Sequence, residues 1–526
     1  MNPEILKVIR EKGVLLEKEV IDILESFGDS SVASNFLEKL VQLSGKKIIT
    51  KSLLKDNMLG VQKFVEGLSI DKKGEIERIF VKFGFTIEIY KEKASAESNQ
   101  KREVSEKSRI TYKIFCPDTK TDKKLEVQDF SKHFRARYQQ LQKILLQRPN
   151  LTSLIAINKI SSERKTLSII GILSEKRITK NGNLILTLED LTGKINVLVK
   201  PDRKEVFESA DEMQLDDVVA VKASGNKDIL FAHEIYFPDA FIHEKKKFEE
   251  EACIAFISDI HAGSERHLER SMNNFLEWMN SKDETAKKIK FLFIIGDNVD
   301  GVGIFPGQEY LLKMKSMEEQ YKLLASYLKK LPEDVTIFMC PGQHDAVRVA
   351  EPQPIIGKKY ALALYDIENL ILVTNPSLVK LIEKEKEFNV LMYHGASIHN
   401  LISEIPELRN MKAHKCPAKA VRHMLKRRHL APTHSSVIYI PNAEKDPMVI
   451  SEVPDVLCTG EVHRNDIDTY NGVLIVTSSC WQAQTPYEEK VGNMTEPGKV
   501  TVLNLKTREL RIFDFVDDEE MGKWTK

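Results

Sequence analysis

The chain has 526 residues, which is too long for one hydrophobic core and predicts several domains. Its 78 lysines and arginines balance 78 aspartates and glutamates, so the net charge is zero, which excludes a protein that coats nucleic acid by bulk electrostatics. The six cysteines form no Cys-x-x-Cys pair and no stretch approaches ~18 uninterrupted apolar residues, so we expect no zinc ribbon, redox motif or membrane contact, and a cytoplasmic location.

The first region, residues 1–90, is predicted to be an N-terminal helical domain. Its apolar residues recur at helical spacing, as in Phe36, Leu37, Leu40 and Leu43. The pattern leaves open whether these helices dock a partner or form a plain helical bundle. Residues 91–109 mix charges and contain almost no apolar side chain, so they are predicted to be a flexible linker.

The second region, residues 110–245, is predicted to be an OB-fold domain with a strand and a helix ahead of it. The strand is expected at 112–115 and the helix around 130–146. Short runs of alternating polarity follow, separated by turns, and Lys180-Asn181-Gly182-Asn183 is typical of a tight hairpin. About five short strands with one intervening helix fit a small closed barrel. Their order and turns resemble nucleic-acid-associated OB folds.

The third region, residues 246–526, alternates apolar strands with helices. Runs such as 254–257 and 291–295 are apolar throughout, which is typical of strands covered on both faces. Polar residues follow each strand, at the position where α/β folds build their sites. These clusters are Ser258-Asp259-Ile260-His261, Gly296-Asp297, Gly342-Gln343-His344-Asp345, His394-Gly395 and Gly460-Glu461-Val462-His463.

The mixture of imidazoles and carboxylates in these clusters suits Mn²⁺, Fe²⁺ or Zn²⁺ better than a calcium cage. Taken singly, each cluster is more often a cap or a surface group than a ligand set. Five of them in order, each after a strand, indicate one metal site. On an extended segment, Asp-x-His spacing would point the side chains of Asp259 and His261 the same way, toward one ion.

The ordered set resembles the calcineurin-like metallophosphoesterase superfamily over about residues 250–500. That pattern is Asp-x-His, Gly-Asp, Gly-Asn-His-Asp/Glu, His and Gly-His-x-His. The resemblance implies a phosphoesterase domain of two packed sheets flanked by helices, and two divalent ions, Mn²⁺ first, with Mg²⁺, Fe²⁺ or Zn²⁺ as alternatives. It implies catalytic roles for Asp297, between the two ions, and for His344, beside the scissile phosphate. The implied metal ligands are Asp259, His261, Asp297, Gln343, His394, Glu461 and His463.

Two positions depart from the superfamily pattern. Gln343 stands where the pattern has Asn and keeps the amide oxygen on a longer side chain. Glu461 stands where the pattern has His, and it adds a negative charge. Asp300 is expected to orient a ligand from outside the centre. These departures leave two alternatives open: an active hydrolase, or a vestigial site in a scaffold.

Further segments resemble the small, exonuclease subunits of archaeal family-D DNA polymerases over about residues 105–515. A barrel directly ahead of a phosphoesterase domain is their arrangement, and 342–348, 429–434 and 479–485 are similar to their motifs. The resemblance implies a 3′→5′ exonuclease acting on single-stranded DNA ends, a heterodimer with a large polymerising subunit, and a nucleoid-associated location. The sliding clamp is a further candidate partner.

Two other functions remain in view. A catalytically inactive scaffold would stabilise the large subunit, and a free-standing phosphodiesterase would act on small molecules. Polymerase activity is not expected from this chain, because no segment resembles a nucleotidyl-transfer palm.

A basic cluster near residue 425 is the candidate DNA-binding surface. It could contact the phosphate backbone of the primer strand, or it could be a solvated helix face. His434 and Trp481 could likewise reach the substrate or serve the core. The cluster consists of Arg422, Lys426, Arg427 and Arg428.

Overall fold

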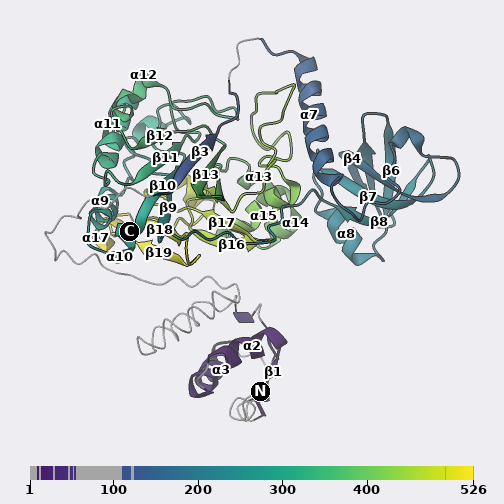
Figure 1. Ribbon diagram of the computed structural model, residues 1–526, viewed down its shortest axis with the longest axis horizontal. Coiled ribbons are helices and arrows are strands. Elements are labelled where there is room, and N and C mark those ends of the chain that lie inside the picture. The colour runs from purple at the N-terminus through teal and green to yellow at the C-terminus, as the bar shows by residue number, and fades with distance from the viewer. Residues whose placement is uncertain are drawn as a thin grey trace. The chain divides into compact units, whose positions relative to one another are not determined.

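The computed structural model describes residues 9–10, 13–27, 30–44, 48–50, 53–54, 109–119, 124–491 and 493–524. They belong to two compact units, Met1–Tyr90 and Lys91–Lys526. The fold is mixed α and β, and the second unit contains two six-stranded sheets and a closed five-stranded barrel (Figure 1). No helix among the described residues is long and apolar enough to cross a membrane.

The first unit is helical as expected where it is described, with helices α2 (Lys18–Ser26) and α3 (Ser30–Ser44). Their apolar faces pack together, and the rings of Phe27 and Phe36 lie 5.4 Å apart. A short parallel pair of strands, β1 (Leu15–Leu16) and β2 (Ile48–Ile49), was not predicted. The predicted linker lies outside the described residues except for Arg109.

The barrel closes in the order β4-β5-β6-β8-β7. Strand β5 shows the alternating burial that its sequence predicts, and the predicted hairpin turn follows β4, with Gly182 at φ 73°. The apolar side chains that point inward form a core of their own. The barrel elements are β4 (Lys165–Ile178), β5 (Leu184–Glu189), β6 (Lys194–Val199), α8 (Lys204–Asp211), β7 (Val218–Gly225) and β8 (Leu230–Tyr236).

The strand predicted ahead of the barrel belongs elsewhere, which corrects its assignment to the barrel domain. Strand β3 (Thr111–Phe115) pairs antiparallel with β13 (Ser377–Glu383) of the second sheet. Local polarity identifies a strand but not its neighbour, and here Ile114 packs against the core between the two sheets. Helix α7 (Val127–Leu145), which follows it, packs on the barrel through residues such as Tyr138 and Leu141.

The two sheets pack face to face as the middle layers of a four-layer domain (Figure 1). The first sheet has the order β12 (Leu370–Leu372), β11 (Thr336–Cys340), β10 (Ile289–Ile295), β9 (Cys253–Ile257), β18 (Lys499–Asn504) and β19 (Leu510–Asp514). The second has the order β16 (Asp466–Tyr470), β17 (Val473–Thr477), β15 (Val456–Thr459), β14 (Lys386–Met392), β13 and β3. Aromatic and branched residues from both sheets, among them Phe256, Phe293, Val390 and Val456, form the core between them.

Helices cover the outer face of each sheet. The first sheet packs against α9 (Glu269–Met279), α10 (Glu284–Lys288), α11 (Met317–Leu328) and α12 (Lys358–Ala361). The second packs against α13 (Ile398–Glu404), α14 (Pro406–Asn410) and α15 (Ala418–Arg427). The remaining short helices are η1 (Ile157–Lys159), η2 (Gln308–Tyr310), η3 (Leu362–Leu364), η4 (Ala413–Lys415), α16 (Pro486–Val491) and α17 (Asp518–Met521).

Parallel pairing decides where the polar clusters meet. Strand β10 runs parallel to β9 and to β11 in the first sheet, and β14 runs parallel to β15 in the second. Each of these five strands is followed directly by one of the predicted clusters. Because parallel strands end at the same edge of a sheet, the clusters gather at one edge of the domain.

Candidate metal centre

The predicted metal ligands come together at the carboxyl ends of the five parallel strands. Five of them have left-handed backbone conformations, with φ between 46° and 71°, which non-glycine residues rarely adopt. Such strain costs about 1–3 kcal/mol per residue and persists where the surrounding fold enforces it, most often at functional sites. The five residues are Asp259, His261, Asp297, Glu461 and His463.

The convergence of Asp259 and His261 was therefore predicted correctly, but for the wrong reason. The predicted geometry was an extended segment, whereas both residues are left-handed. Backbone hydrogen bonds hold this turn: Asp259 N donates to Gly296 O at 3.0 Å, and His261 N donates to Asp297 O at 3.0 Å. The turn after β9 is thus built on the turn after β10.

The first subsite consists of Asp259, His261 and His463, whose ligand atoms lie within 4.8 Å of one another. The Nε2 atoms of the two histidines are 3.1 Å apart, and His463 Nε2 is 3.3 Å from Asp259 Oδ1. Each imidazole has a carboxylate at its other nitrogen: Asp300 Oδ1 lies 3.0 Å from His261 Nδ1, and Glu488 Oε1 lies 2.7 Å from His463 Nδ1. Outer carboxylates of this kind fix the tautomer so that Nε2 faces a metal.

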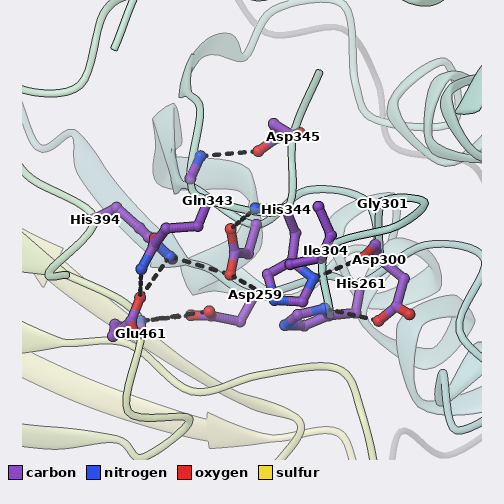
Figure 2. Close-up of polar contacts among 12 residues, drawn as sticks. Asp259, His261, Asp300, Gly301, Ile304, Gln343, His344, Asp345, His394 and Glu461 are labelled. Carbon is purple, nitrogen blue, oxygen red and sulfur yellow. Dashed lines mark hydrogen bonds and ion pairs between the residues drawn. The ribbon is translucent and has the colours of Figure 1, made fainter. Parts of the chain in front are cut away.

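The second subsite lies around His394, with Asp259 and Asp297 in ligand range. His394 Nδ1 donates to the Ile295 carbonyl at 2.9 Å, which leaves Nε2 facing Asp297 Oδ2 at 3.2 Å and Glu461 Oε2 at 3.1 Å. Gln343 Nε2 donates to the same Glu461 oxygen at 2.7 Å (Figure 2).

Gln343 leaves one ligand atom unused. Its Oε1 atom is buried and has no hydrogen-bond partner among the described residues. A buried carbonyl oxygen without a partner is costly, and a cation would satisfy it. The amide oxygen that the superfamily pattern uses is therefore still available on the longer side chain.

The electrostatics of the centre favour bound positive charge. Burial raises the pKa of Asp297, but the charge of His394 outweighs burial and holds that pKa well below its usual range. The same balance of burial and His394 lowers the pKa of Glu461 to about 2. Burial lowers the pKa of His394, and the charge of Asp297 raises it well above its usual value. Protons supply the counter-charge here, and divalent ions bound to deprotonated ligands would replace them. The donor set therefore fits divalent cations.

His344 stands at the mouth of the centre. Its backbone N–H donates to Asp297 Oδ1 at 2.9 Å, and its Nδ1–H donates to the Asp300 carbonyl at 2.6 Å. Its Nε2 atom lies 3.9 Å from Asp297 Oδ2, and 21% of the side chain is exposed. Figure 2 shows His344 between the group around Glu461 and the pair formed by His261 and Asp300. Nε2 is thus available to a substrate that reaches the carboxylates.

Two glycines make room for the carboxylates. A Cβ atom at Gly342 would collide with Asp297 Oδ1, and one at Gly460 would lie 2.5 Å from Asp259 Oδ2. Any larger residue at either position would displace a predicted ligand.

Known proteins resemble this chain over most of its length. The family model for the B-type subunit of DNA polymerases alpha and epsilon matches residues 254–467. The DNA polymerase II small subunit of Methanothermobacter thermautotrophicus is 32% identical over 520 residues, which are 98% of this chain and 100% of the relative. The chain belongs to the family of archaeal DNA polymerase II small subunits. The Thermoplasma acidophilum member is 36% identical over 414 residues, 78% of this chain and 82% of that one.

Other members of the DNA polymerase II small-subunit family are longer. The Pyrococcus furiosus protein is 36% identical over 401 residues, which are 74% of this chain and 64% of the relative, so the match spans less than two thirds of that protein. Among solved structures, an archaeal phosphodiesterase aligns with 50% of this chain and 98% of its own length, at 14% identity and a TM-score of 0.25. A score this low supports no argument about the fold.

The basic cluster of this DNA polymerase II small-subunit homologue serves a different purpose from the one predicted. Arg427 is 2% exposed, and its Nε donates to Asp217 Oδ1 of the barrel at 2.9 Å. Arg428 is 6% exposed, and its Nε donates to the Ile450 carbonyl at 2.7 Å. These two arginines are buried structural groups, which corrects their assignment as DNA contacts.

The two other members of the cluster are more exposed but also paired. Arg422 forms an ion pair with Asp468, and Lys426 forms one with Glu212 of the barrel. Trp481 is fully buried in the core outside the first sheet, and His434 bonds Asp216 of the barrel at 2.7 Å. These contacts mark α15 and the chain after it as the attachment between barrel and phosphoesterase-like domain.

The outer partners of the ligands were only partly foreseen in this family member. Asp300 orients His261, as predicted, and is itself held by Gln482 at 3.1 Å and Gln308 at 3.3 Å. Glu488, the partner of His463, was missed, because nothing in the local sequence distinguishes it from an ordinary surface glutamate of a short helix. The proximity of His399 to Glu461, at 3.6 Å, was missed as well.

Proposed function

We propose that this chain is the small subunit of a heterodimeric family-D DNA polymerase and removes nucleotides from single-stranded 3′ ends of DNA. The observation that carries the proposal is the convergence of Asp259, His261, Asp297, His394 and His463 at one edge of two packed sheets. Together with family membership, this donor set supports metal-dependent hydrolysis of phosphodiester bonds.

Two divalent cations fit the donor set. Asp259, His261 and His463 would hold the first. His394, Gln343 and Glu461 would hold the second, with Asp297 between the two. Bound there, such ions would lower the pKa of a water molecule and neutralise charge on the phosphate oxygens. Mixed nitrogen and oxygen ligands favour Mn²⁺, with Mg²⁺, Fe²⁺ and Zn²⁺ as alternatives.

The chain's own residues then position the substrate and move a proton. His344 is fixed through Nδ1 on the Asp300 carbonyl, so its Nε2 can donate a hydrogen bond or a proton to the leaving oxygen. Asp300 also fixes His261 through its side chain. One residue thus orients both a metal ligand and the proposed acid.

A catalytically inactive scaffold is the second candidate function. It is favoured by the ion-free contacts of Glu461, which already satisfies Gln343 and His394 and could hold the second subsite closed. The ion pairs between α15 and the barrel would serve such a scaffold equally well, because they stiffen the molecule for docking a large subunit.

One assay separates these functions. The full-length chain, alone and with the large subunit, is incubated with Mn²⁺ and single-stranded DNA labelled at its 5′ end. The exonuclease proposal predicts stepwise shortening from the 3′ end, lost with EDTA. His344→Ala should slow it about 10²-fold or more, as expected for loss of a general acid, while His434→Ala, a half-exposed histidine bonded to the barrel, should leave it unchanged.

The outcomes against the proposal are equally definite. No Mn²⁺-dependent shortening in either preparation would support the scaffold. Turnover of a chromogenic phosphodiester without cleavage of DNA would instead support a small-molecule phosphodiesterase.

A further inference from the structure

Glu461 lies between two imidazoles that come from one short segment. His394 follows β14, and His399 belongs to the first turn of α13. His394 Nε2 is 3.1 Å from Glu461 Oε2, and His399 Nε2 is 3.6 Å from Glu461 Oε1. The two carboxylate oxygens therefore have different neighbours: Oε2 faces the centre, and Oε1 faces His399.

His399 is well placed to act on this carboxylate from outside. Its side chain is 44% exposed, and its ring stacks on His414 with centroids 5.4 Å apart and planes 29° apart. The intervening Gly395 permits the close approach, because a Cβ atom there would lie 3.2 Å from Glu461 Cβ and collide with Ile398. The stacking limits the orientations of the His399 ring.

The other ligands follow a common rule. The outer nitrogen of His261 contacts Asp300, that of His463 contacts Glu488, and that of His394 contacts the Ile295 carbonyl. A carboxylate ligand needs such a partner even more, because it can rotate and offer either oxygen. For Glu461, the group at ion-pair distance from its outer oxygen is His399.

We propose that His399 is the positioning residue of Glu461, and that the two form a composite ligand arm for the second divalent cation. The arm replaces the single histidine that the superfamily pattern has at position 461. Glu461 Oε2 binds the ion, and His399 holds Oε1 so that the carboxylate keeps one orientation. This inference rests on the proposed function of the centre as a two-cation site.

The test is a double-mutant cycle on the full-length chain, with Mn²⁺ binding measured by isothermal titration calorimetry. His399→Ala should weaken one of two binding events about tenfold, the usual loss when an outer partner is removed, and leave the other unchanged. His399→Gln, which keeps a donor at this position, should restore most of the affinity. In the Glu461→His background, His399→Ala should change affinity by no more than about twofold, the additivity limit for independent sites.

The controls separate this inference from the proposal beneath it. A wild-type chain that binds no Mn²⁺ overturns the proposed function. Two-ion binding with the same His399→Ala loss in both backgrounds, or with no loss in either, overturns the composite arm alone. Circular dichroism checks each variant's fold, and Glu461→Gln, in which His399→Ala should also have little effect, replaces Glu461→His if that variant misfolds. His434→Ala should match the wild type throughout.

Discussion

The metal centre and the basic cluster of α15 were both predicted from side chains that carry charge, and only one gathers its charges around an open site. In the centre, carboxylates and imidazoles from five strands face one another, and a buried amide oxygen has no partner among the described residues. In α15, Arg427 is matched within the chain by Asp217, and Lys426 by Glu212. A ligand site keeps valences open, whereas a structural ion pair uses them.

The comparison also explains why the two patterns differ in predictive value. The ligand clusters combine residue type with a position after a strand, and parallel pairing brings such positions together whatever the local sequence. A run of basic residues on a helix carries no such positional information. Its partners, Asp217 and Glu212, lie more than 200 residues away in the sequence, in the barrel.

The largest expected effect comes from Asp297→Asn, which keeps the size of the side chain and removes the charge between the two subsites. We expect the Mn²⁺-dependent exonuclease rate to fall about 10³-fold, comparable to losing a main electrostatic contact in an active site. The midpoint of thermal unfolding in EDTA should not fall in parallel, because this carboxylate is one of three crowded acids. Retained activity would break the comparison, since the charges of the centre would then be as structural as those of α15.

A smaller effect, of opposite kind, is expected from Arg427→Met. The variant leaves Asp217 buried without its ion-pair partner, so the free energy of unfolding in urea should drop by about 3–5 kcal/mol. Arg422→Met removes a more exposed pair with Asp468 and should cost about 0–1 kcal/mol. The salt dependence of DNA binding should be the same for Arg427→Met and wild type. A slope smaller by about 1 would instead restore Arg427 as a phosphate contact.

Much of the architecture was accessible from the sequence because it depends on local periodicity. The barrel strands, the hairpin at Gly182 and the strand ends that bear the ligands all follow from alternation and turn residues. The pairing of β3 with β13 was not accessible, because polarity does not name a neighbour. The left-handed turns at Asp259 and His261 were missed for a related reason: only the packed strands around them enforce that strained backbone.

A third buried carboxylate sharpens the comparison, because in the described part of the chain it lies at ion-pair distance from no cation. Glu351 is 2% exposed and accepts a hydrogen bond from Tyr393 Oη at 3.2 Å. Burial raises its pKa to about 8, although that hydrogen bond opposes the shift. In the unfolded chain the carboxyl titrates near about 4.3. Above that pH the folded state binds the extra proton, so its contribution to stability is full below about pH 4.3 and is lost as the pH rises toward about 8.

Glu351→Gln removes this titration and keeps the shape of the side chain. The difference in unfolding free energy, variant minus wild type, should therefore rise with pH by up to about 1.4 kcal/mol per unit between pH 5 and 8. The measurement is urea unfolding in EDTA, so that cation binding does not contribute. Glu163→Gln, at an exposed glutamate paired with Lys165, should give a curve parallel to the wild type. Parallel curves for Glu351→Gln as well would mean that Glu351 is ionised in the folded state. A buried acid could then persist here without an opposite charge, and the open valences of the metal centre would no longer by themselves indicate a ligand.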